Sequence, residues 1–107
     1  MKIVTNSFKS GIIVRLSGDI DLETSPELRT ELITYIRKKI NPILVDFEAV
    51  SYVDSSGIAT LVEALKLMRA YNGSLKLIAI PKSVIEIFNF LKLEKVFEIY
   101  SDASSCG

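Results

Sequence analysis

The stretch Val53-Asp54-Ser55-Ser56-Gly57-Ile58 marks the point where an apolar strand gives way to a helix. Small polar residues favour a helix start, because their side-chain oxygens accept hydrogen bonds from first-turn N–H groups that otherwise lack a partner. The glycine that follows the two serines leaves the backbone uncovered, so another molecule could approach closely. We interpret this turn as an exposed serine that can be modified, held on a rigid platform.

The composition indicates one folded domain without a strong electrostatic preference for any partner. The chain has 107 residues, 49% of them apolar, and its 13 basic and 13 acidic residues cancel. This balance does not favour nucleic acid or an anionic membrane. No stretch approaches the roughly 20 apolar residues of a membrane span, and the first residues lack the apolar run of a signal peptide. We expect a cytoplasmic monomer with no direct membrane insertion and no nucleic-acid partner.

The first part of the chain predicts a hairpin. Two apolar runs, Ile3–Phe8 and Ile12–Ser17, are joined by the tight connection Lys9-Ser10-Gly11. In the second run, apolar and polar residues alternate with the period of a half-exposed strand.

The next segment predicts an amphipathic helix. Either Ser25 caps it with Pro26 at the first helical position, or Thr24 caps it with Glu27 closing a capping box. The predicted helix ends at Asn41-Pro42. Its apolar stripe consists of Leu28, Leu32, Ile36 and Ile40.

The mostly apolar run Ile43–Phe47 is typical of a central strand. The helix that starts at the serine turn should end at Asn72-Gly73, residues that tolerate a left-handed C-cap. Its predicted buried side consists of Ile58, Leu61, Val62, Leu65 and Met68. Its predicted outer side is a shallow surface formed by Ala59, Thr60, Glu63 and Ala64.

The last part of the chain predicts a strand over Leu75–Ile80 and a helix that opens with a capping box over Ser83–Glu86. A short edge strand over Val96–Tyr100 follows. We therefore expect one domain over residues 1–100 and a loose polar tail over residues 101–107, in which Cys106 contributes little to a core. The alternation of elements predicts an α/β fold with a small mixed sheet, an N-terminal hairpin plus parallel strands, packed with three to four α-helices.

The residues needed for several kinds of catalytic or binding site are absent from the sequence. The chain has no histidine and a single cysteine, so neither a serine–histidine–acid triad nor an ordinary imidazole-based metal site can form. The five glycines are dispersed and make no phosphate-binding loop, which disfavours a nucleotide-binding protein. We expect a protein that is not an enzyme and that binds no metal or cofactor.

Two segments together resemble the STAS domain of bacterial anti-sigma factor antagonists. They are Leu16–Asp21, which contains a Gly-x-x-Asp pattern, and Val50–Ile58, which contains the Asp-Ser-Ser-Gly turn. The similarity in element order covers nearly the whole chain and implies a STAS-like sandwich.

The resemblance implies a specific switch. In this family the serine directly after the aspartate, here Ser55, is phosphorylated by an anti-sigma factor that is itself a serine kinase. A serine/threonine phosphatase of the metal-dependent class removes the phosphate, and only the unmodified form binds the anti-sigma factor and so releases a sigma factor. The expected partner-binding surface consists of Asp21, Asp54, Ser56, Gly57, Ala59, Thr60 and Glu63.

Two alternatives remain open from the residues alone. Both serines could simply cap the helix, and Asp21 could simply end a strand or cap a turn. The same resemblance also fits a soluble STAS subunit docked on a membrane transporter, such as a lipid-transport ABC permease.

Overall fold

Five strands and three α-helices alternate along residues 1–106, the part of the chain that the computed structural model describes. The strands are β1 (Lys2–Phe8), β2 (Gly11–Ile20), β3 (Ile43–Val53), β4 (Leu75–Ile78) and β5 (Glu98–Tyr100). The helices are α1 (Ser25–Arg37), α2 (Ser55–Arg69) and α3 (Lys82–Phe90), and a 3-10 helix, η1 (Ala103–Cys106), follows β5. The predicted α/β class, with a hairpin at the start, is confirmed.

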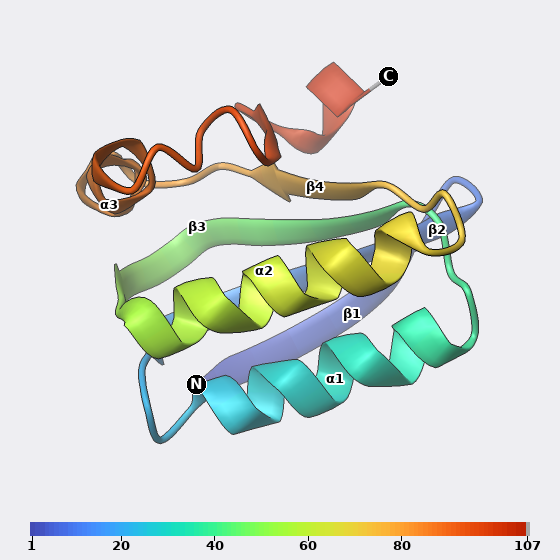
Figure 1. Cartoon of the computed structure of the whole chain (residues 1–107), viewed down its shortest axis with the longest axis horizontal. Coiled ribbons are helices and arrows are strands. Elements are labelled where there is room, and N and C mark those ends of the chain that lie inside the picture. The colour runs from blue at the N-terminus through green and yellow to red at the C-terminus, as the bar shows by residue number, and fades with distance from the viewer. Residues whose placement is uncertain (107) are drawn as a thin grey trace.

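The strands form one mixed sheet in the order β1-β2-β3-β4-β5. Strand β1 is antiparallel to β2, whereas β2, β3, β4 and β5 are parallel to their neighbours. Parallel strands end at the same edge of a sheet, so the connections that lead into α1, α2 and α3 gather there. Figure 1 shows the beginning of α2 at this edge, directly after β3.

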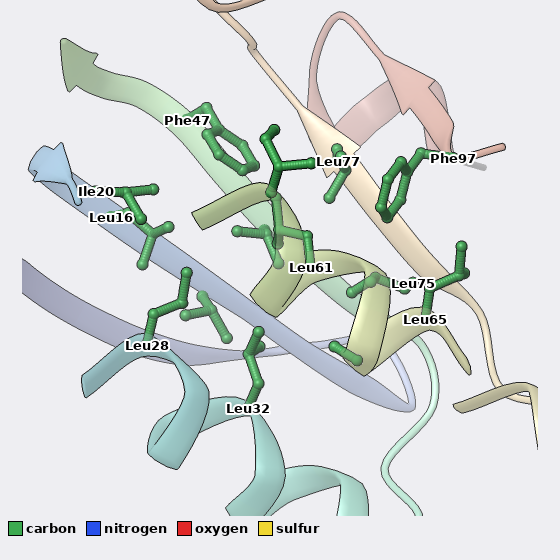
Figure 2. Packing of buried hydrophobic residues seen from close by; sticks show 14 of the residues in the cluster. Leu16, Ile20, Leu28, Leu32, Phe47, Leu61, Leu65, Leu75, Leu77 and Phe97 are labelled. Atoms are coloured by element: carbon green, nitrogen blue, oxygen red, sulfur yellow. The ribbon is translucent and has the colours of Figure 1, made fainter. Parts of the chain in front are cut away.

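The main core lies between the sheet and the helices. Figure 1 shows α1 and α2 side by side across one face of the sheet. Figure 2 shows apolar side chains from these two helices packed against those of the strands. The labelled core residues include Leu16, Ile20, Leu28, Leu32, Phe47, Leu61, Leu65, Leu75, Leu77 and Phe97. Helix α3 adds Val84 and Phe88 to the same core, and the Phe88 ring meets Phe97 edge-on at 5.8 Å between centroids.

A second, smaller cluster covers part of the opposite face of the sheet. Its buried residues are Ile13, Leu44 and Ile78. Ala103 and Cys106 of η1 pack against them, so the prediction that Cys106 lies in a loose tail is wrong. Gly107, the last residue of the predicted tail, lies outside the described residues.

Strand lengths differ from the sequence predictions because of irregular pairing. Strand β3 continues to Val53 rather than ending at Phe47, and β2 continues to Ile20. The register between them shifts twice, after Arg15 and after Gly18. Each shift gives β3 an extra residue and interrupts the alternation of polar and apolar side chains by which a strand is recognised.

Both predicted capping boxes are wrong. In the described part of the chain, Thr24 stands at the N-cap of α1, but its side chain accepts no hydrogen bond from the first turn. Helix α3 begins at Lys82, after Pro81, so Ser83 lies inside its first turn and does not cap it. The predicted apolar stripe of α1 is confirmed for Leu28, Leu32 and Ile36, which are buried. Ile40 lies beyond the helix, which ends at Arg37 and not at Asn41-Pro42. Within residues 1–106, none of the helices combines the length and the apolar character that crossing a membrane requires.

We predict that Leu61→Ala lowers the free energy of unfolding by about 2–5 kcal/mol, because it leaves a cavity in the core. Leu61 is completely buried between α2 and the sheet. Urea unfolding followed by circular dichroism measures the change. Leu67→Ala is the matched control, because Leu67 lies on the same helix but is 40% exposed, and it should change the free energy by less than about 1 kcal/mol. Equal effects of the two substitutions would contradict this packing.

Candidate functional site

The serine turn, Asp54–Gly57, is hydrogen-bonded to the end of the neighbouring strand β2. The backbone N–H of Asp54 donates to the carbonyl oxygen of Ile20 at 3.0 Å, and Ile20 pairs with Val53 in the last register position of β2 and β3. The loop before α1 and the start of α2 therefore lie together at the carboxyl edge of the sheet.

Asp54, and not either serine, is the N-cap of α2. Its Oδ1 accepts from the backbone N–H groups of Ser56, at 2.8 Å, and Gly57, at 3.3 Å. The same oxygen accepts from the Ser56 hydroxyl at 2.5 Å. These donors, the Ser56 hydroxyl first, lower the pKa of Asp54 below its ordinary value of 3.8, so the carboxylate stays charged at neutral pH.

The two serines differ in what their hydroxyl groups can do. Ser55 is the first residue of α2 and is exposed, and within residues 1–106 its hydroxyl makes no hydrogen bond. Ser56 is half-buried, and its hydroxyl is engaged by Asp54. Of the two, within residues 1–106, Ser55 alone presents an unengaged hydroxyl to solvent.

Asp21 organises the loop that leads into α1. Its backbone N–H donates to Thr24 Oγ1 at 2.9 Å, and the Thr24 N–H donates to Asp21 Oδ1 at 3.1 Å. This reciprocal pair resembles a capping box one turn ahead of α1. The carboxylate thus has a capping role, and it remains half-buried at the same edge as the serine turn.

Two residues of the expected surface are inaccessible. Gly57 is buried, and a Cβ there would lie 2.7 Å from Ile20 Cγ2. The missing side chain therefore makes room for core residues and does not open the backbone to another molecule. Thr60 is only 8% exposed, and its hydroxyl donates to the Ser56 carbonyl oxygen at 3.0 Å. Ala64, which was expected beside it on the outer side, is 2% exposed. Helix α1 lies alongside α2, so α2 has two covered sides.

The outer face of α2 instead carries a hollow of about 460 Å³. Its lining residues are Ala59, Val62, Glu63, Lys66 and Leu67. Ala59 and Glu63 were expected on this side, whereas Lys66 and Leu67 were missed. Val62 was expected on the buried side; it packs partly against the core and also lines the hollow. The spacing i, i+3, i+4, i+7 and i+8 would have identified one face of a helix.

An ion pair between the two helices borders the hollow. Arg29 Nε donates to Glu63 Oε1 at 2.7 Å, and Arg29 Nη2 donates to Glu63 Oε2 at 2.9 Å. The hydrogen bond from Arg29 lowers the pKa of the Glu63 carboxyl, and the same contact raises the pKa of Arg29. This two-bond geometry holds the Glu63 side chain in one orientation.

We predict that Asp54→Asn lowers the thermal stability of the chain at neutral pH. A group whose pKa is depressed by folding stabilises the fold above its ordinary pKa, and this contribution is lost as the pH falls through the lower, folded-state value. The difference in midpoint between wild type and variant should therefore be present at pH 7 and shrink below about pH 3.8. Circular dichroism melts between pH 2.5 and 7, on the order of five points, measure it. A difference that grows on acidification would contradict the assigned cap.

Curated relatives match most of the chain. It is 29% identical over 91 residues to the anti-sigma-B factor antagonist of Bacillus subtilis, covering 85% of this chain and 83% of the relative. It is 30% identical over 88 residues to the protein of the same name in Listeria monocytogenes, covering 82% of this chain and 77% of the relative.

The fold also matches a solved structure of SpoIIAA, the Bacillus cell fate determinant, in its phosphorylated form. The TM-score is 0.77 at 20% sequence identity, and the match covers 98% of this chain and 96% of that one. The family model for the STAS domain matches residues 2–106, which is nearly the whole chain. The chain described here therefore belongs to the STAS domain family.

Proposed function

We propose that this chain is an anti-sigma factor antagonist whose binding is switched by phosphorylation of Ser55. The unmodified chain binds an anti-sigma factor that is also a serine kinase, and this binding releases a sigma factor. A metal-dependent serine/threonine phosphatase reverses the modification. The chain acts as a binding protein in the cytoplasm and not as an enzyme.

One observation carries the proposal: Ser55 is exposed with an unengaged hydroxyl, whereas the neighbouring Ser56 is occupied by Asp54. The relatives named as anti-sigma factor antagonists support the choice of partner. SpoIIAA, whose fold this chain shares, has been solved in both phosphorylated and unphosphorylated forms. None of these relatives is named as a transporter subunit, so the alternative of a permease-docked STAS protein is not favoured.

The position of Ser55 makes the modification compatible with the fold. A phosphate adds about −1.5 to −2 charges at pH 7. At the first residue of a helix, the macrodipole favours a negative charge by about 0.3–1 kcal/mol at an exposed site. Because the hydroxyl is exposed and makes no hydrogen bond within residues 1–106, the phosphate displaces no core contact there.

Against a docked partner the same phosphate is unfavourable. It brings bulk and charge into a packed interface, where the exclusion of water strengthens its repulsion from the carboxylates of Asp54 and Asp21, and like-charge contacts there cost several kcal/mol. A loss of about 3–4 kcal/mol corresponds to a two- to three-order reduction in affinity. Phosphorylation can therefore control binding without a large conformational change.

We predict that Ser55→Ala abolishes phosphorylation by the cognate kinase but retains binding, because it removes only the acceptor hydroxyl. Ser55→Asp and Ser55→Glu should bind more weakly, because each adds a charge at the same position. Mass spectrometry after incubation with the kinase locates the phosphate, and titration calorimetry measures the affinity.

Ser56→Ala is the matched control, because it removes the neighbouring hydroxyl and leaves Ser55 intact. This variant should still be phosphorylated at Ser55. Phosphate found on Ser56 in the wild-type chain, or full binding by Ser55→Glu, would contradict the proposed switch.

A further inference from the structure

We propose that the hollow on the outer face of α2 is a second anchor point for the anti-sigma factor, which inserts an apolar side chain there and places a carboxylate against Lys66. This inference rests on the proposed function, because it names a further part of the same interface.

The hollow is continuous with the serine turn along one helix face. At 100° per residue, Ser55, Ala59, Val62 and Lys66 fall within a narrow stripe along the axis of α2. At a rise of about 1.5 Å per residue, Glu63 in the middle of the hollow lies about 12 Å from Ser55 along that axis. No other element separates the two, since they lie on consecutive turns of one helix.

A stable protein interface is large enough to cover Ser55 and the hollow at the same time. A standard interface buries about 800 Å² on each partner, which corresponds to a patch about 30 Å across. A patch of that size centred on Ser55 extends about 15 Å in each direction, beyond the middle of the hollow. A partner that covers the serine and follows α2 therefore reaches it.

The lining chemistry defines what would fit. Ala59, Val62 and Leu67 supply apolar walls, and Leu67 is 40% exposed although it is a large apolar residue. The carboxylate of Glu63 is already engaged by Arg29, which fixes one wall before any partner arrives. Among residues 1–106, Lys66 forms no ion pair. The complementary surface is thus an apolar side chain accompanied by an acidic one.

Leu67→Ala and Lys66→Glu test the inference on the unphosphorylated full-length chain. The probe is each purified anti-sigma factor kinase encoded in the same genome, titrated by calorimetry. We expect Leu67→Ala to weaken binding by about tenfold, as truncation of a partly buried interface anchor does. Lys66→Glu should weaken it by a similar factor, and more strongly at low salt, because it places two like charges together.

Val4→Ala is the matched control. Val4 is 42% exposed, close to the exposure of Leu67, but it lies on β1 opposite Arg15, on the sheet face that does not carry α2. Its truncation should change the affinity by less than about twofold. Circular dichroism melts check that each variant is folded, and if Leu67→Ala is not, Lys66→Glu decides the question.

The outcomes separate this inference from the function on which it rests. Wild-type affinity in both Leu67→Ala and Lys66→Glu, together with weak binding of Ser55→Glu, would overturn the second anchor and leave the switch intact. If the unmodified wild-type chain bound none of the kinases, both proposals would fail. If Leu67→Ala left the affinity for the kinase unchanged but altered the sedimentation coefficient of the chain, the hollow would be an interface between two copies. The inference would then be wrong.

Discussion

A backbone hydrogen bond from the N–H of Asp54 to the carbonyl oxygen of Ile20 joins the two halves of the site. It extends the pairing of β2 and β3 by one step, to the point where β3 turns into α2. The parallel arrangement of these strands makes this contact possible, because both chains leave the sheet at the same edge. The serine turn and the loop around Asp21 therefore form one surface.

Asp54 then distinguishes between two chemically identical side chains. Its Oδ1 atom accepts from two backbone N–H groups and from the Ser56 hydroxyl, so a single carboxylate both starts the helix and occupies one serine. The other serine, one position earlier, lies outside this arrangement. A pair of adjacent serines thus becomes one engaged and one available hydroxyl through capping geometry alone.

The sequence predicts the order of elements well, because apolar periodicity and turn residues act locally. It fails where several elements meet. The ends of β2 and β3 depend on register shifts that no local pattern reveals. The buried state of Thr60 follows from the position of α1 beside α2, which adds a second covered side that a simple amphipathic analysis does not contain.

The choice of cap at α2 shows the same limit. Aspartate and serine are equally good N-caps, so the residues around position 55 permit several assignments. The end of β3 decides among them, because it fixes Asp54 in an extended conformation as the last residue before the helix. Ser55 is then left as the first helical residue, with its side chain exposed.

The β1–β2 hairpin lies at the end of the sheet opposite the serine turn, since β2 runs ten residues from Gly11 to Ile20 before the site begins. At about 3.3 Å per step, a strand of this length spans about 30 Å from its first residue to its last. Lys9 and Ser10 at the tip of the hairpin are exposed, whereas Gly11 beside them is pressed against the Pro42 backbone. A fluorophore or surface tether attached at Lys9 or Ser10 would therefore leave the whole serine-bearing end of the molecule unobstructed.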